Sequence, residues 1–351
     1  MNARGELRHG ARILVIRLSA LGDVLFSLET VASMKRERPD LRIEFLVEDR
    51  HAAILRGCPD LDAVRTIPRR GRLARLRALL ALRRERYDVL LDLHGLLKSA
   101  WPVLALRAER KLGFAAPGSR EGAQYAYRER LALPLPLPHR AERGLFLLRA
   151  LGLQGAPAKP RLALPPEPHP FWRGVPRPRV VMHPGASAFA AFKRWPLAKF
   201  ESLARRLSGE GLEVAVSFGP GEDALAAAIL RAAPRARGLD GKALGLLGLA
   251  HALRDADLVV AADTGPLHVA AAAGARVLAL FGPKDETLYG PRWHDGARVL
   301  WHEVPCRPCK RRICASPQCV LGIGVEDVAA AVLSMLADCT ASASRADAEQ
   351  H

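Results

Sequence analysis

The chain has 351 residues, of which 49% are apolar and 25% charged, so it is long enough for two globular domains and does not have a disordered composition. No uninterrupted apolar run reaches the length of a membrane span, which argues against an integral membrane protein. The first ten residues, MNARGELRHG, lack the apolar core of a signal peptide. We therefore expect a cytoplasmic protein.

The formal net charge of +17 is unevenly distributed along the chain. Residues 1–150 hold 29 Lys or Arg against 17 Asp or Glu, a balance of +12. The remaining 201 residues hold 24 against 19, a balance of +5. A basic first half favours an anionic partner, which could be nucleic acid, an anionic membrane face or an acidic substrate.

The first strand–turn–helix unit of the chain carries a carboxylate after its turn. Residues 12–18 (RILVIRL) are typical of a buried strand, and residues 19–23 (SALGD) turn tightly at Gly22 into a helix that reaches about Arg36. Asp23 either complements the helix dipole or presents a carboxylate at the carboxyl end of the strand, where open α/β sheets bind ligands.

Two further strands are expected in the first half, at residues 41–47 and 88–93. The second leads into residues 94–100 (HGLLKSA). His94 and Lys98 are therefore also expected at the carboxyl end of a strand.

Residues 69–86 are the densest positive feature of the chain, with eight arginines and one glutamate. They predict a helix with three leucines on one face: Leu73, Leu76 and Leu80. Because Arg77 and Arg84 project close to this apolar stripe, the helix is a poor membrane-embedding amphipath. We expect it to form an electrostatic surface or a simple solvated face.

A proline-rich segment divides the chain. Residues 156–179 hold eight prolines, a composition typical of a stiff, extended connector. We predict one α/β domain over residues 1–155 and a second over residues 180–338, with a cleft between them. The polar residues 339–351 are expected to be a disordered tail.

The second half repeats the strand–helix alternation. Apolar runs predict strands at residues 180–182, 214–218, 258–262 and 277–281. After the third run, residues 263–267 (DTGPL) provide Gly265 for a tight turn and Pro266 for the first helical position. The helix that follows would point free N–H groups and a partial positive charge above the turn, which favours an anion such as phosphate.

Several polar residues are expected at the carboxyl ends of these strands: His183, Ser187, Lys193, Glu222, Asp263, Thr264, Gly265 and His268. Lys193 would supply charge for a pyrophosphate, and Glu222 could accept hydrogen bonds from ribose hydroxyls. We interpret the set as a nucleoside-diphosphate site, although neither a P-loop nor a G-x-G-x-x-G motif is present.

We expect no metal at this site, because a lysine and helix N–H groups can neutralise a diphosphate without Mg²⁺. Two D-x-D pairs, Asp60/Asp62 and Asp255/Asp257, are interpreted as structural. A cluster of four cysteines leaves two alternatives open, a structural zinc site or reduced thiols. Its members are Cys306, Cys309, Cys314 and Cys319.

Seven motifs together resemble glycosyltransferase family 9, the inverting heptosyltransferases of bacterial lipopolysaccharide assembly. They are ILVIRLSALGDVL (13–25), DLHGLLKSA (92–100), SREGA (119–123), HPGAS (183–187), KRWP (193–196), FGPGE (218–222) and DTGPLH (263–268). They cover nearly the whole chain. Their order and spacing are specific to the family and much less specific to one donor sugar.

The resemblance implies an α/β fold of the glycosyltransferase B architecture, with two Rossmann-like doubly wound domains facing across a cleft. It implies that Asp23 is the general base, which takes the proton from an acceptor hydroxyl as that oxygen attacks the anomeric carbon. The donor-binding residues would be Ser187, Lys193, Glu222, Asp263, Thr264, Gly265 and His268. No cofactor and no metal are implied.

The resemblance further implies an ADP-heptose donor and an anionic lipopolysaccharide inner-core acceptor, a Kdo or heptose residue on lipid A. The enzyme would then be peripheral at the cytoplasmic face of the inner membrane. The acceptor-binding residues would be Arg69, Arg70, Arg72, Lys98 and, in an irregular loop, Arg120. Three alternatives stay open: a family 9 enzyme with another donor, a sugar-nucleotide epimerase, or a nucleic-acid-binding protein that uses residues 69–86.

Overall fold

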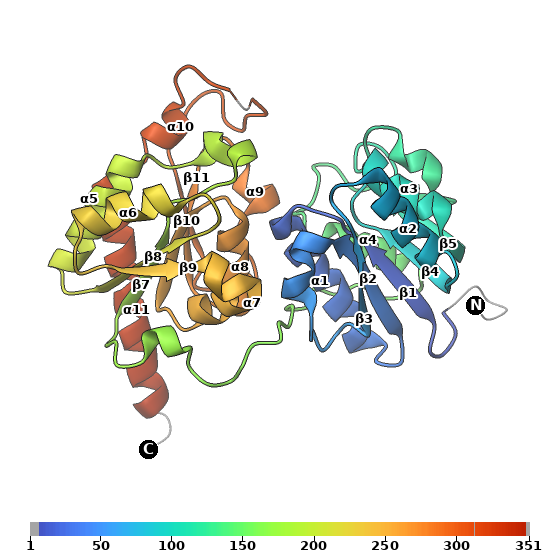
Figure 1. Cartoon of the computed structure of the whole chain (residues 1–351), viewed down its shortest axis with the longest axis horizontal. Coiled ribbons are helices and arrows are strands. Elements are labelled where there is room, and N and C mark those ends of the chain that lie inside the picture. Colours follow the sequence, from blue (N-terminus) through green and yellow to red (C-terminus); the bar gives the residue numbers. More distant parts are fainter. Residues whose placement is uncertain (1–6, 312, 349–351) are drawn as a thin grey trace. The chain divides into compact units, whose positions relative to one another are not determined.

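The computed structural model describes residues 7–311 and 313–348, and the chain divides into two compact units at Ala163 and Leu164 (Figure 1). The division falls inside the proline-rich segment 156–179, where the sequence analysis places the domain boundary. Each unit contains one parallel six-stranded sheet with helices on both faces, so the predicted α/β fold is confirmed.

The first unit is a doubly wound sheet. Its strands are β1 (Arg12–Ile16), β2 (Arg42–Glu48), β3 (Ala63–Ile67), β4 (Arg86–Asp92), β5 (Arg107–Phe114) and β6 (Glu129–Leu131). Its helices are α1 (Leu21–Glu37), α2 (Arg72–Leu82), α3 (Leu97–Ala105) and α4 (Arg143–Arg149), with short 3₁₀ helices η1 (Asp49–Leu55) and η2 (Ala123–Ala126). The strand order β3-β2-β1-β4-β5-β6 places the topological switch point between β1 and β4.

The second unit repeats this order. Its strands are β7 (Arg179–His183), β8 (Glu213–Phe218), β9 (Arg237–Asp240), β10 (Leu258–Ala262), β11 (Val277–Phe281) and β12 (Arg298–Trp301). Its helices are η3 (Pro170–Trp172), η4 (Ala188–Lys193), α5 (Leu197–Gly209), α6 (Asp223–Ala232), α7 (Gly241–Arg254), α8 (Gly265–Ala273), α9 (Glu286–Tyr289), α10 (Gln318–Leu321) and α11 (Val325–Ala348). The order β12-β11-β10-β7-β8-β9 gives β7 the central place that β1 has in the first unit.

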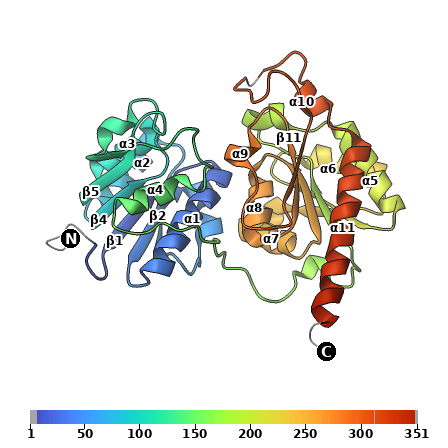
Figure 2. The same cartoon turned by 180° about the vertical axis from the view of Figure 1, so that it is seen from behind.

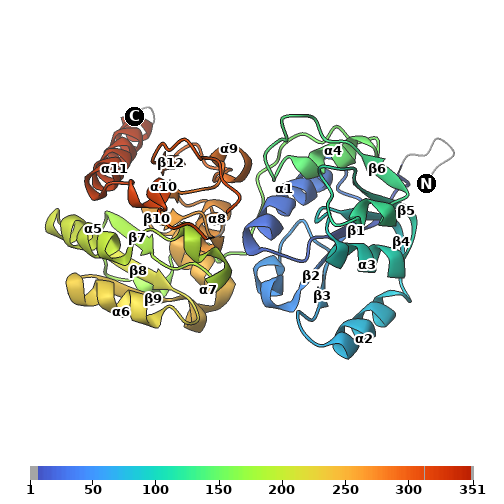
Figure 3. The ribbon, with the colours of Figure 1, turned by 90° about the horizontal axis from the view of Figure 1, so that it is seen from above.

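The helices cover both faces of each sheet (Figures 2 and 3). In the first unit α1 packs with α4, and α2 packs with α3 on the opposite face. In the second unit α5 packs with α6 and α11, and α7 packs with α8 on the opposite face. Central strands are therefore buried on both faces, which is why β10 and β11 read as continuous apolar runs.

The sequence analysis missed the edge strands β3, β6, β9 and β12. These strands are short and only partly buried. β6 has three residues, ERL, and β9 has four, RGLD. Because an edge strand lacks a neighbour on one side, it does not need the continuous apolar pattern that marks a central strand.

The C-terminal helix is longer than predicted. α11 continues to Ala348, so residues 339–348, for which the sequence predicted a disordered tail, are helical. Residues 349–351 lie outside the described residues. The extension is rich in alanine, which favours a helix even where the sequence is polar. In the described part of the chain, no helix is both long and apolar enough to cross a bilayer.

The structure changes the interpretation of α2. This helix buries Leu82 and packs Ala78 and Leu79 against the core. The stripe of Leu73, Leu76 and Leu80 lies on the other side, and these side chains are 71%, 52% and 51% exposed. The surface of α2 is therefore apolar as well as basic, whereas the sequence analysis expected an electrostatic surface or a simple solvated face.

Gly113 of β5 provides a test of the first core. A Cβ at Gly113 would lie 2.4 Å from the ring of Tyr127, whose hydroxyl donates a 2.7 Å hydrogen bond to Asp92. Gly113→Ala should therefore lower the free energy of unfolding by about 1–3 kcal/mol, measured by urea denaturation. Gly209→Ala, with open space around the added methyl group at the end of α5, is the matched control and should not lower the midpoint. Equal midpoints for both variants would contradict this packing.

Candidate active site

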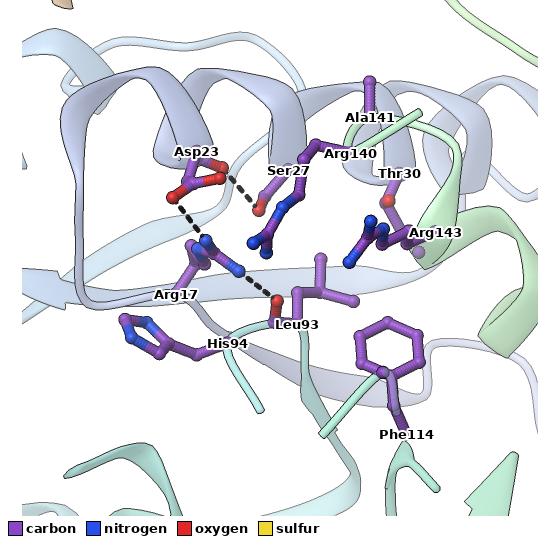
Figure 4. Close-up of a pocket in the computed structure, with 12 residues that line it drawn as sticks. Arg17, Asp23, Ser27, Thr30, Leu93, His94, Phe114, Arg140, Ala141 and Arg143 are labelled. Carbon is purple, nitrogen blue, oxygen red and sulfur yellow. Dashed lines mark hydrogen bonds and ion pairs between the residues drawn. The ribbon is translucent and has the colours of Figure 1, made fainter. Parts of the chain in front are cut away.

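Asp23 lies in the first turn of α1, after the loop that follows β1 (Figure 4). Its Oδ2 is 2.6 Å from Nη2 of Arg17. The Arg17 guanidinium also donates to the carbonyl oxygen of Ser19 at 3.1 Å and to that of Leu93. Because these carbonyl groups belong to the loops after β1 and β4, Arg17 fixes Asp23 at the switch point of the first sheet.

The charges around Asp23 keep its carboxylate ionised. Burial alone would raise the pKa of Asp23, but the positive charges of Arg17 and Arg140 outweigh it and hold this pKa well below the usual range of an aspartate. The N-terminus of α1 acts in the same direction. The side chain of Asp23 is still 25% exposed, so the carboxylate is both charged and accessible.

A small cavity of about 10 Å³ lies beside this ion pair. Its lining includes Arg17, Asp23, Ser27, His94, Arg140 and Arg143. Figure 4 shows the guanidinium groups of Arg140 and Arg143 on the same side of α1 as Asp23 and Thr30. The volume is about that of one water molecule, so a larger ligand can reach Asp23 only from its exposed side.

Asp92, at the end of β4, is a structural carboxylate. It is fully buried and accepts hydrogen bonds from Ser99 Oγ at 2.7 Å, from the Tyr127 hydroxyl at 2.7 Å and from the amide of His94 at 2.8 Å. These bonds fix the loop that begins α3.

His94 follows in this loop and is neutral. Burial and the charges of Arg17 and Lys98 lower its pKa to about 2. Its Nδ1 accepts a hydrogen bond from the amide of Leu18 at 3.3 Å. His94 therefore joins the loops after β1 and β4 and is not a proton donor at neutral pH.

Two of the five predicted acceptor-binding residues, Lys98 and Arg69, act on the same side chain, His51. The charges of Arg50, Lys98 and Arg69 all act on His51 and, with burial, lower its pKa to about 4. Lys98 also contacts Ser19 and lies 3.4 Å from Glu48. The sequence analysis missed Arg50 and His51, which follow β2 in a segment without a recognisable motif.

The other three predicted acceptor-binding residues are exposed and more separate. Arg70 and Arg72 lie at the start of α2, and no contact in the described part of the chain joins them to Asp23. The amide of Arg120 donates to the carbonyl oxygen of Gly95 at 2.9 Å, so its loop is tied to the end of β4. The backbone of Arg120 is thus tied to the loop after β4, which also carries His94.

In the second unit, Lys193 and His268 both contact Asp263. Nζ of Lys193 contacts the carboxylate of Asp263 and lies 3.2 Å from its carbonyl oxygen, and Nε2 of His268 lies 3.3 Å from Oδ1. Burial would raise the pKa of Asp263, but His268 and Lys193 outweigh it and lower this pKa. An ammonium group has three N–H donors, so Lys193 can keep Asp263 and still bind a phosphate oxygen.

The N-terminus of α8 lies next to this triad. Thr264 is the N-cap residue, but its hydroxyl donates to the carbonyl oxygen of Ala262 at 3.2 Å and makes no capping hydrogen bond. The first-turn N–H groups of α8, which begins at Gly265, are thus not satisfied by a side-chain cap. They and Lys193 form a cationic site suited to a diphosphate.

Glu222 follows β8, and a backbone hydrogen bond fixes its carboxylate. The amide of Gly219 donates to its Oε2 at 2.8 Å, and Nε2 of His183 lies 3.7 Å from the same oxygen. Burial lowers the pKa of His183, so the imidazole is neutral. A Cβ at Gly185 would lie 2.1 Å from the carboxyl carbon of Glu222. A side chain at position 185 would therefore have to displace the carboxylate of Glu222.

The KRWP motif has a physical role at each of its first three positions. Lys193 contacts Asp263, Arg194 donates to the carbonyl oxygen of Ala186 at 2.7 Å, and Trp195 is buried with its Nε1 bonded to the carbonyl oxygen of Ile323. Trp195 thus anchors the segment that presents Lys193. Ser187 is exposed at the N-terminus of η4 and makes no side-chain capping bond there.

The structural interpretation of the two D-x-D pairs is confirmed. All four carboxylates accept hydrogen bonds within the fold: Asp60 from Arg161 (3.1 Å), Asp62 from the amide of Ile43 (2.7 Å), Asp255 from Arg254 (2.9 Å) and Asp257 from the amide of Arg179 (2.7 Å). They hold segments of the fold together.

The cysteine cluster does not form a metal site among the residues that the structure describes. Cys306, Cys309, Cys314 and Cys319 are free thiols. No three His, Cys, Asp or Glu side chains in this described part are grouped as ligands for one ion.

The two sheets and their sites define the class of protein. Each sheet has the strand order of a nucleotide-binding doubly wound fold. One sheet carries a partly exposed, ionised carboxylate, and the other carries a lysine and a helix N-terminus that can bind an anion. This is an α/β fold of the glycosyltransferase B architecture. The model of glycosyltransferase family 9 (heptosyltransferase) matches residues 75–319, more than half of the chain, and the chain belongs to this family of glycosyltransferases.

Similar proteins agree with this assignment. The chain is 28% identical over 329 residues to lipopolysaccharide heptosyltransferase 1 of Pseudomonas aeruginosa, covering 86% of this chain and 87% of that one. It is 27% identical over 347 residues to lipopolysaccharide heptosyltransferase 3 of Escherichia coli, covering 92% and 98%. The fold resembles Escherichia coli heptosyltransferase WaaC with ADP, with a TM-score of 0.75, 21% identity and coverage of 92% and 99%.

The Lys193–Asp263 pair provides a test of the second site. Lys193→Met leaves the largely buried Asp263 carboxylate with His268 alone, and should lower the free energy of unfolding by about 1–3 kcal/mol at pH 7. Because pairing lowers the pKa of Asp263, this stabilisation is present above the ordinary aspartate pKa of about 3.9 and is lost as the pH falls. The difference in unfolding free energy between wild type and Lys193→Met, measured by urea denaturation, should therefore become smaller at acid pH.

The double variant Lys193→Met/Asp263→Asn is the control for this test. It removes the buried charge together with its partner and should recover part of the lost stability. If the difference in unfolding free energy between wild type and Lys193→Met stayed constant down to pH 3, this would contradict an ionised pair.

Proposed function

We propose that this chain is an inverting, metal-independent heptosyltransferase that moves a heptose from ADP-heptose to a lipopolysaccharide inner-core acceptor, a Kdo or heptose residue on lipid A. The observation that carries the proposal is the ionised Asp23 carboxylate, which Arg17 holds at the carboxyl end of β1. Relatives of similar length are lipopolysaccharide heptosyltransferases, and WaaC has been solved with ADP and with ADP-2-deoxy-2-fluoro heptose.

Asp23 acts as the general base in this proposal. Its exposed carboxylate oxygen accepts the proton of the acceptor hydroxyl while that oxygen forms a bond to the anomeric carbon of the donor. The bond to the diphosphate breaks on the opposite face, so a single displacement inverts the anomeric centre. Arg17 keeps Asp23 ionised and in place and does not itself contact the reacting atoms.

The low pKa of Asp23 constrains the timing of proton transfer. A carboxylate paired with arginine is a weak base, and it cannot remove the proton from an alcohol before the oxygen has begun to form its new bond. The acceptor hydroxyl becomes acidic as positive charge develops on its oxygen. We therefore infer late proton transfer, driven by departure of the diphosphate.

The second unit stabilises the leaving group. Lys193 and the N–H groups at the start of α8 offset the negative charge that develops on the diphosphate, and Asp263 fixes the position of Lys193. These groups are cationic without a metal ion, which supports metal-independent transfer. Glu222, positioned by Gly219 and Gly185, is suited to accept hydrogen bonds from the ribose hydroxyls.

The first unit binds the acidic acceptor. The charges of Arg69 and Lys98 both act on His51, and Arg120 belongs to a loop tied to the end of β4. Their charge complements the phosphate and carboxylate groups of the inner core. Because this acceptor is anchored by a lipid, we propose that the enzyme works as a peripheral protein at the cytoplasmic face of the inner membrane.

Asp23→Asn tests the general base. An amide cannot accept the proton, so transfer of heptose should fall by at least about a hundredfold, while ADP binding measured by calorimetry stays unchanged. Asp327→Asn makes the same exchange at an exposed position of α11 and should retain activity. Wild-type transfer by Asp23→Asn would show that the base is assigned wrongly.

Thermal stabilisation by nucleotides tests the donor site. ADP, UDP, GDP and CDP are compared at equal concentration with and without Mg²⁺, since a ligand at one hundred times its Kd adds about 2.7 kcal/mol of stability. We expect selective stabilisation by ADP, unchanged by Mg²⁺. Gly185→Ala displaces Glu222 and should weaken this effect, whereas Gly209→Ala should retain it.

The nucleotide comparison also separates the alternatives. Selective stabilisation by UDP or GDP would mean that the donor is not ADP-heptose but another nucleotide sugar. The family and the proposed role of Asp23 would not be affected. No response to any of the four nucleotides would contradict the donor site itself.

A further inference from the structure

Two neighbouring helices of the first unit expose large apolar side chains. On α2, Leu73, Leu76 and Leu80 are 71%, 52% and 51% exposed. On α3 the exposed residues recur every three or four positions, with Leu97 at 51%, Trp101 at 63% and Leu104 at 58%. The two helices pack against each other on the same face of the sheet (Figures 1 and 3). We call these six side chains the apolar ridge.

The fold does not need the apolar ridge. α2 already packs on the core through Ala78, Leu79 and Leu82, and α3 through Ala100 and Val103. Six of the eleven large apolar side chains that the described residues expose belong to these two short helices. Single exposed leucines are normal on a protein surface, but a group on adjacent helices marks a binding surface.

The surroundings of the ridge are strongly basic. Exposed arginines precede, interrupt and follow α2: Arg69, Arg70, Arg72, Arg77, Arg83, Arg84 and Arg86. The single glutamate of this segment, Glu85, is paired with Arg12 at 2.6 Å. Arginine charge alone would suit any polyanion. A ridge of leucines with a tryptophan among these arginines suits a partner that is apolar beneath an anionic surface, which is an anionic lipid bilayer.

We propose that α2 and α3 form the membrane-docking surface of this protein, with the apolar ridge inserted among the headgroups of an anionic bilayer and the arginines on the lipid phosphates. Trp101 is the residue type that prefers the interface between headgroups and acyl chains. The purpose of the surface rests on the proposed function, because the acceptor there is a membrane lipid. Arg69 precedes α2 and Lys98 lies in the first turn of α3, so docking would bring acceptor-binding groups to the bilayer.

Vesicle co-sedimentation tests the docking surface in the full chain. Wild type should bind vesicles of equal parts phosphatidylglycerol and phosphatidylcholine much more tightly than vesicles of phosphatidylcholine alone. Leu76→Gln/Leu80→Gln and Trp101→Gln/Leu104→Gln should each weaken binding by at least about tenfold, because they remove inserted apolar surface without changing charge. The matched control is Leu135→Gln, at a 74% exposed leucine outside α2 and α3, which should bind as wild type.

Charge and insertion can be measured separately. Arg77→Gln/Arg84→Gln should weaken binding and reduce its salt dependence, since fewer lipid charges are then neutralised. Insertion of Trp101 should shift the tryptophan emission of wild type to shorter wavelength, and Trp101→Phe should lose most of that shift. Equal affinity of the ridge variants and wild type for anionic vesicles would overturn the proposal. It would also be overturned if wild type and the ridge variants bound duplex DNA as tightly as they bind anionic vesicles.

Transfer assays distinguish failure of this proposal from failure of the proposed function. The ridge variants should keep wild-type transfer to a deacylated, water-soluble acceptor and lose most transfer to the same acceptor embedded in vesicles. If wild type transfers no heptose to either acceptor but its vesicle binding depends on the ridge, the proposed function is wrong and the docking surface stands. If the ridge variants transfer heptose normally to both the soluble and the vesicle-embedded acceptor, the docking surface is wrong and the proposed function stands.

Discussion

The ion pair between Arg17 and Asp23 is the interaction on which the candidate site in the first unit depends. Arg17 is buried, and a buried guanidinium without a partner would strongly destabilise the fold. The pair and the two backbone carbonyls that accept from Arg17 satisfy this charge and join the loops after β1 and β4 to α1. The same contact with Arg17 lowers the pKa of Asp23 and keeps it anionic at neutral pH, so it both stabilises the fold and sets the protonation state of Asp23.

The second unit contains a similar ion pair in which the charges are exchanged. In the first unit a buried cation holds a partly exposed carboxylate, whereas in the second the buried carboxylate of Asp263 holds Lys193, whose side chain is 18% exposed. Both pairs lie at the carboxyl ends of central strands of sheets with the same strand order. One fold thus presents a fixed anion in one copy and a fixed cation in the other, which fits the base and the leaving-group site of the proposed reaction.

The sequence predicted the parts of the fold in which one pattern decides the structure. β10 and β11 are apolar on both faces, and DTGP can only begin a helix after a turn, so the strand, turn and helix around Asp263 were clear. The edge strands lack such a pattern. Arg17 was missed because it reads as one charged residue at the end of a strand. Its role depends on Leu93 and Asp23, and the former is distant in sequence.

The leucines of α2 show why sequence periodicity alone could not predict which face of the helix packs on the core. Arginines next to the stripe argued against membrane insertion, but the stripe is one of two apolar faces, and Ala78, Leu79 and Leu82 form the one that packs on the core. Only the fold shows which face remains exposed and that α3 adds Trp101 beside it. Exposed apolar surface of this extent favours aggregation, so its presence on two short helices is better explained by a partner than by folding.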